Sequence, residues 1–169
     1  MRCAMSIRRG LVFCLVLIGL MISGVHSANA EESLADQVKA AMKVLQEKSM
    51  KLGAPSAEGT ALSFGTTKMN GNYALVDEIK DQFKCTATFF VKKGDSYIRV
   101  ATNVIKDDGS RAVGTPLDPK GVAIAKIAKG EAYYGLADIL GKQYETGYEP
   151  IRNAAGEVVG ITYIGFPVK

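Results

Sequence analysis

Four polar side chains occupy alternate positions near the C-terminal end of the sequence: Lys142, Tyr144, Thr146 and Tyr148. If this segment is a β-strand, all four project to one face, because successive side chains of a strand point to opposite faces. An ammonium, two phenols and a hydroxyl in one row can bind a polar ligand. The row can equally be a solvated outer face, so the pattern alone leaves both interpretations open.

Two arginines could add positive charge to such a site. Arg99 lies inside an apolar strand-like segment, and Arg111 opens a loop. A buried arginine requires an anionic partner, because an unpaired charge away from water is unfavourable. A carboxylate ligand would supply that partner. The alternative is an ion pair inside the protein, with Asp95, Asp107 or Asp118.

The first 30 residues have the organisation of a secretory signal peptide. Two arginines precede an apolar run over Leu11–Ile22, and Ala28-Asn29-Ala30 is a small-residue cleavage site. The run is shorter than the roughly 20 residues of a membrane-spanning helix. A retained membrane anchor is the alternative, but the pattern favours cleavage and a periplasmic chain that begins at Glu31.

Removal of this segment takes away the imidazole and most of the thiols. The only histidine, His26, and two of the three cysteines lie in it, which leaves one thiol, Cys85. Catalytic triads and Cys/His zinc sites are thereby excluded, and no phosphate-binding glycine motif is present. The segment 107–110 lacks the ligand spacing of a calcium loop, and Glu145 and Glu149 have no evident acid–base partner. We expect no catalytic residue, no metal site and no cofactor.

The net charge argues against nucleic acid as a partner. It is +4 for the whole sequence, but three arginines and no acid leave with the signal peptide, which lowers it to +1. Neither a basic surplus nor a basic run remains to neutralise phosphates.

The elements that must position the polar residues follow from hydrophobic periodicity. An apolar stripe predicts a long N-terminal helix over about 33–52, and a short helix is predicted over 73–83. Asp118 before Pro119 predicts the start of a helix of about three turns that ends at Gly130. The N-terminal stripe can pack on the protein's own sheet, or it can also pair with a second copy and make a homodimer.

Alternating segments predict the strands. A hairpin is expected over 87–103, and three further strands over 131–139, 142–152 and 158–166, whereas 57–72 is predicted as a loop or an edge strand. The class is α+β with a five-stranded antiparallel sheet. The last strand is apolar on both faces and is therefore expected at the centre of the sheet. The N-terminal helix can cover only one face, so loops and the short helix must cover the other, which leaves room for a pocket.

Several motifs, in consistent order, resemble the extracytoplasmic Cache domains of bacterial chemoreceptors, of the Cache_3 and Cache_3–Cache_2 type. They are the segments 64–73, 87–91, 99–102, 108–115, 141–144 and 148–152. The resemblance extends from about residue 60 to 166. It implies a PAS-like antiparallel sheet with a long N-terminal helix, within a single sensor domain over residues 31–169.

The resemblance also implies detection of small molecules, often short carboxylates, without catalysis. The candidate contacts at matching positions are Arg99, Arg111, Tyr133, Lys142, Tyr144 and Tyr148. Family receptors continue into a transmembrane helix and a signalling module, whereas this sequence stops at Lys169. We therefore expect a sensor that passes its ligand state to a membrane receptor or histidine kinase in chemotaxis or signal transduction. The alternative is an interaction protein that docks on such a partner through its N-terminal helix.

We predict that the mature protein begins at Glu31, because the apolar run is short and a cleavage site follows it. N-terminal sequencing of the protein from a periplasmic extract checks this. A sequence that begins at Met1 would contradict it.

Overall fold

The structure, a computed structural model, describes residues 32–168. The predicted signal peptide, residues 1–30, and its cleavage site lie outside this range. Residues Glu31–Lys169 group into one unit by their contacts. None of the helices within the described residues is both long enough and apolar enough to cross a membrane.

Helix α1 (Leu34–Met50) begins where the sequence predicted it. The Ser33 side chain accepts a hydrogen bond from the backbone N–H of Asp36, and the Ser33 hydroxyl donates to the Asp36 carboxylate at 2.6 Å. This reciprocal cap satisfies a backbone donor that the first helical turn leaves free.

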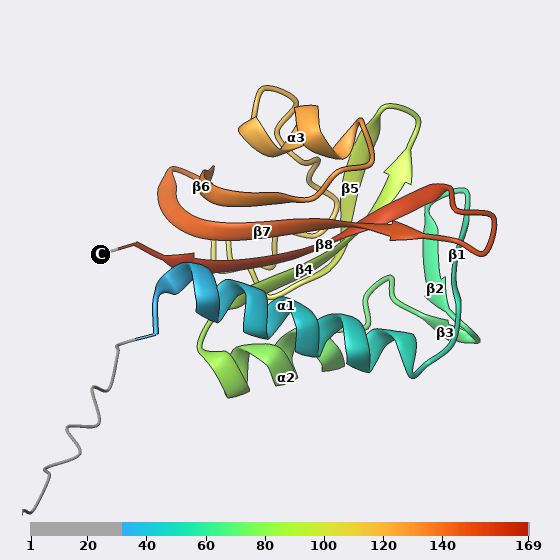
Figure 1. The fold of residues 1–169 in the computed structure, drawn as a ribbon, viewed down its shortest axis with the longest axis horizontal. Helices are drawn as coiled ribbons and strands as arrows, with labels where there is room; N and C mark the ends of the chain where they lie inside the picture. Colours follow the sequence, from blue (N-terminus) through green and yellow to red (C-terminus); the bar gives the residue numbers. More distant parts are fainter. Residues whose placement is uncertain (1–31, 169) are drawn as a thin grey trace, which may run out of the picture. The chain divides into compact units, whose positions relative to one another are not determined.

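The main sheet has five antiparallel strands in the order β5-β4-β8-β7-β6 (Figure 1). The predicted α+β class and the central position of the last strand are therefore confirmed. The strands are β4 (Thr86–Lys93), β5 (Ser96–Thr102), β6 (Tyr133–Ile139), β7 (Lys142–Arg152) and β8 (Val158–Pro167).

One face of the sheet is covered by α1 together with α2 (Ala74–Phe83), as Figure 1 shows. The α1 residues Val38, Ala41 and Leu45 are fully buried in this core. One expectation is corrected here: the short helix α2 lies beside α1 and not on the opposite face. Of the two interpretations of the N-terminal stripe, the structure shows packing on the protein's own sheet.

The opposite face is covered by the segment 103–121 and by α3 (Val122–Ile127), which pack over a second core. Helix α3 is shorter than predicted and starts later, at an N-cap of Gly121. The reason lies in Asp118, whose Oδ1 accepts a hydrogen bond from the backbone N–H of Lys120 at 2.9 Å. The Asp118-Pro119 pair thus makes a turn that precedes the helix and does not cap it.

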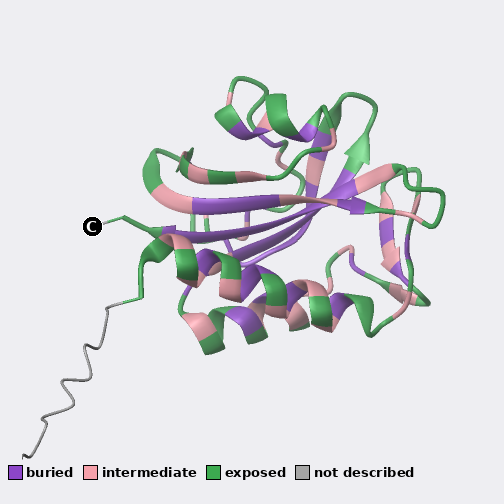
Figure 2. Ribbon diagram, in the orientation of Figure 1, coloured by how far each residue is buried: buried purple, intermediate pink, exposed green. Residues whose placement is uncertain are grey.

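A second, three-stranded sheet was missed by the sequence interpretation, which left 57–72 as a loop or an edge strand. Its strands are β1 (Pro55–Glu58), β2 (Ala61–Phe64) and β3 (Thr67–Lys68). Tight turns at Gly59 and Gly65, with φ of 58° and 56°, make strands this short possible. Leu62 and Phe64 of β2 are buried in the core that α1 covers. Figure 2 colours the buried residues of the domain purple.

Because Leu45 is fully buried, we predict that Leu45→Ala lowers the free energy of unfolding by about 2–5 kcal/mol. The matched control is Leu34→Ala on the same helix, where the side chain is 37% exposed and the change should stay within about 0.5 kcal/mol. Urea denaturation measures both. Equal losses in the two variants would contradict the packing of α1 described above.

Candidate ligand-binding site

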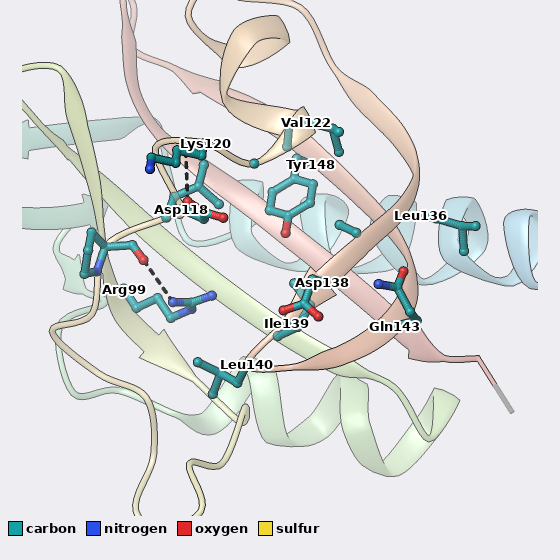
Figure 3. A pocket seen from close by; sticks show the side chains of 15 residues that line it. Arg99, Asp118, Lys120, Val122, Leu136, Asp138, Ile139, Leu140, Gln143 and Tyr148 are labelled. Atoms are coloured by element: carbon teal, nitrogen blue, oxygen red, sulfur yellow. Dashed lines mark hydrogen bonds between the residues drawn. The ribbon is translucent and has the colours of Figure 1, made fainter.

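A cavity of about 610 Å³ lies between the sheet and the cover formed by the segment 116–121 and α3. Strands β5, β6 and β7 each contribute to its wall (Figure 3). Its polar lining residues are Arg99, Asp118, Lys120, Asp138, Gln143 and Tyr148.

Arg99 is the buried charge of this cavity, with 6% of its surface exposed. One terminal nitrogen donates hydrogen bonds to Thr115 Oγ1 at 2.7 Å and to the Pro116 carbonyl at 3.2 Å, and the guanidinium lies 5.0 Å from the centre of the Phe90 ring. Its Nε is buried and has no hydrogen-bond partner. Within residues 32–168, Arg99 forms no ion pair with any carboxylate.

The environment of Arg99 is therefore electrostatically incomplete. Burial lowers the pKa of Arg99, because removal from water disfavours the charged form. The internal pairing considered for it, with Asp95, Asp107 or Asp118, is not formed in the described part of the chain. An anion in the cavity that Arg99 lines would supply the charge partner that the guanidinium lacks within residues 32–168.

Tyr148 on β7 is the second buried residue of the wall. Its ring lies 4.9 Å from that of Tyr163 and 6.2 Å from that of Tyr133, centre to centre. Burial raises the pKa of Tyr148, so the phenol stays protonated near neutral pH and can donate a hydrogen bond. Figure 3 shows its hydroxyl pointing toward the interior of the cavity.

Arg111 lies outside this cavity. Its two terminal nitrogens donate to the two carboxylate oxygens of Asp77 on α2, at 2.8 and 2.9 Å, and its guanidinium lies 4.4 Å from the centre of the Tyr73 ring. The structure thus places Arg111 in an internal ion pair, with an acid that the sequence interpretation did not consider. The same guanidinium also donates to the Thr102 carbonyl at the end of β5, at 2.8 Å.

The row on β7 is divided between two places. Lys142 and Tyr144 line a neighbouring cavity of about 40 Å³, and Tyr148 lines the large one. Thr146 is buried and donates to the Gly135 carbonyl at 2.6 Å. Tyr133 donates its hydroxyl hydrogen to the Leu136 carbonyl at 2.7 Å and reaches the site through its contact with the Tyr148 ring.

The sequence profile of the Cache 3/Cache 2 fusion domain matches residues 23–169. The chain belongs to this family. Its helix followed by a five-stranded antiparallel sheet is the PAS-like fold of Cache sensor domains, which in general sense ligands and do not catalyse reactions.

Two solved structures are similar to this Cache domain. The sensor domain of Escherichia coli DcuS is 18% identical with a TM-score of 0.44, and the alignment covers 76% of this chain and 92% of that one. A protein of Rhodococcus sp. RHA1 described as a transcriptional regulator is 14% identical with a TM-score of 0.42, covering 81% of this chain and 79% of that one. A search of curated proteins found no match.

Other chemistry finds no support in the described residues. Burial raises the pKa of the Cys85 thiol to about 12, so it is not a nucleophile near neutral pH. Within residues 32–168, no three Cys, His, Asp or Glu side chains gather as ligands of a metal ion would.

Several cavity residues of this Cache domain were not predicted as ligand contacts: Asp118, Lys120, Asp138, Gln143, Leu136 and Leu140. Asp118 was considered only as a helix cap or an ion-pair partner. The β6–β7 turn carried a usable signal, because Leu140 precedes Gly141 at a position that normally holds Asn, Asp or Gly. Leu140 has a φ of 54°, which is strained for leucine.

Because Arg111 is paired internally, we predict that Arg111→Met changes the affinity for any organic acid that binds this domain by less than about 2-fold. Loss of the partly exposed ion pair with Asp77 should lower the free energy of unfolding by about 1 kcal/mol. Calorimetric titration and urea denaturation of the variant measure the two quantities. A 10-fold loss of affinity at unchanged stability would return Arg111 to the binding site.

Proposed function

We propose that this Cache domain binds a small organic anion, with a carboxylate of the ligand on the Arg99 guanidinium. The observation that carries the proposal is a buried arginine that lines a cavity, has a buried N–H without a partner, and forms no ion pair within residues 32–168. Two further groups suit the same ligand. The Tyr148 hydroxyl can donate a hydrogen bond to it, and Lys120 adds a second positive charge at the wall.

We further propose that the domain works in the periplasm after cleavage of the signal peptide, and that a membrane receptor or histidine kinase reads its ligand state. Membership of the Cache family supports a role in signal sensing, because Cache domains are typically periplasmic sensor domains. A link to chemotaxis follows from the resemblance to chemoreceptor domains. On this proposal the domain is not an enzyme, and it acts through occupancy of the cavity.

The second candidate, a docking protein that uses the N-terminal helix, is less well supported. Its argument depended on the apolar stripe of α1, and Val38 and Leu45 of that stripe are buried in the core.

A thermal-shift screen of the mature protein tests the binding function. The panel contains acetate, propanoate, succinate, malate and citrate, together with neutral amides of the same carbon skeletons as controls. We expect at least one acid to raise the melting temperature by mass action, and its amide not to do so. Amides that act as well as the acids would overturn the role assigned to Arg99.

The variant that tests the site is Arg99→Met. Charge-assisted hydrogen bonds contribute roughly 1.5–3 kcal/mol, so we predict a 10- to 100-fold loss of affinity for the bound acid. Arg99→Lys should not restore it, because lysine lacks the planar pair of donors that meets a carboxylate. Arg111→Met, which removes an arginine outside the cavity, is the matched control.

The stability of ligand-free Arg99→Met distinguishes binding from a structural role. Loss of one member of a buried ion pair typically destabilises a protein by about 3–5 kcal/mol. Arg99 has no such partner in the described residues, so we expect a change within about 1 kcal/mol. A variant that melts far lower and still binds the acid normally would show that Arg99 is structural.

A further inference from the structure

The charged residues of the Arg99 cavity are of both signs. Arg99 and Lys120 carry positive charge, and Asp118 and Asp138 carry negative charge, so the lining is formally neutral. A ligand whose only charges are carboxylates would be attracted to Arg99 and repelled by the two aspartates. The wall therefore favours a ligand that also carries a positive group.

The two aspartates have free binding capacity. Asp118 Oδ1 accepts from the backbone N–H of Lys120 at 2.9 Å, and Asp138 Oδ1 accepts from the backbone N–H of Gly141 at 2.8 Å. No other hydrogen bond and no ion pair engages either carboxylate within residues 32–168. Each thus keeps a second oxygen and a charge that nothing in this range neutralises.

The charges are also separated by depth. Arg99 is buried, whereas Lys120, Asp118 and Asp138 are exposed, so the inner end of the site is positive and the outer end, with one lysine and two aspartates, carries a net negative charge. A ligand with a carboxylate at one end and an ammonium close to it would match this order. Three N–H donors let an ammonium bond more than one carboxylate.

Exposed apolar side chains line the same cavity. Val122, Leu136 and Leu140 are 56%, 55% and 46% exposed, although all three are large hydrophobic residues. They come from α3, from β6 and from the β6–β7 turn. Each presents apolar surface at the cavity, against which the uncharged part of a ligand can pack.

From these observations we infer that the ligand is a small zwitterion with an apolar group, the chemistry of an apolar α-amino acid. Its carboxylate binds Arg99, its ammonium binds Asp118 and Asp138, and its side chain contacts Val122, Leu136 and Leu140. The inference rests on the proposed function, because it uses the same Arg99 site and names the class of ligand.

The test compares amino acids with the acids that lack only the amino group. L-alanine, L-leucine and L-phenylalanine are titrated into the mature protein beside propanoate, 4-methylpentanoate and 3-phenylpropanoate. We expect at least one amino acid to bind about 10-fold or more tightly than its partner acid. If none does, the inference is overturned, and binding by any of the simple acids would leave the carboxylate function standing. If neither the amino acids nor the simple acids bind, both the inference and the proposed function are overturned.

Two isosteric variants test the residues. Asp118→Asn and Asp138→Asn replace the carboxylate oxygen that accepts from the backbone N–H of Lys120 or Gly141 with an amide oxygen that can accept the same bond, so the turns are preserved while a charge is lost. Each should reduce the preference for the amino acid over its partner acid, by about 10-fold for whichever aspartate makes the closer contact. The preference is a ratio measured on one protein, so it is insensitive to a small loss of folded protein.

Asp81→Asn is the matched control, because Asp81 lies on α2 and outside the cavity. This variant should keep the full preference. An unchanged preference in both Asp118→Asn and Asp138→Asn would overturn the inference, and so would an equal loss of affinity for the amino acid and its partner acid.

Discussion

The domain is organised by a central strand that must be dry on both faces. Ile161 and Tyr163 of β8 belong to the core under α3, and Ile164 and Phe166 belong to the core under α1. Two covers are therefore required. Helices α1 and α2 make the first and fill it with buried side chains. The second consists of the irregular segment 103–121 and a helix of six residues, and the cavity lies where this cover does not fill the face.

The two arginines, Arg99 and Arg111, differ in the partners that surround the guanidinium group. Arg111 has a carboxylate bound at both terminal nitrogens, a backbone carbonyl and an aromatic ring. Arg99 has an aromatic ring and two neutral acceptors, and no carboxylate within residues 32–168. Within residues 32–168, Arg99 therefore lacks the anionic partner that Arg111 has. Arg99 is the one of the two that lines the cavity.

Periodicity was sufficient for the elements that span the core. The N-terminal helix and the central position of β8 could both be predicted, because burial on a helix or strand leaves a regular pattern in the sequence. Turns were harder to predict than helices and strands. Asp118-Pro119 looks the same in a sequence whether it caps a helix or closes a turn, and only the backbone distinguishes them. Ion pairs between distant elements, such as that of Arg111 with Asp77, depend on where α2 lies against the sheet. The pattern of apolar residues in α2 does not specify that position. Of the residues that line the candidate cavity, Arg99 and Tyr148 were named from the sequence because they belong to regular strands, whereas Asp118 lies in a turn and Asp138 near the end of β6, and neither was named as a contact.

Strand β7 connects the ligand cavity to the N-terminal helix. Tyr148 faces the cavity, while its neighbour Gly147 faces α1, so closely that a Cβ on Gly147 would lie 2.8 Å from a Val38 methyl group. The absence of a side chain at Gly147 lets the helix approach the strand at this position. The Tyr148 side chain at the cavity is therefore one residue from a close approach of β7 to α1. On the other side of the cavity, the hydrogen bonds of Arg99 to Thr115 and Pro116 join β5 to the segment that leads into α3. Packed side chains and hydrogen bonds are therefore continuous from α1 on one face of the sheet, through β7 and the cavity wall, to the segment that leads into α3 on the other.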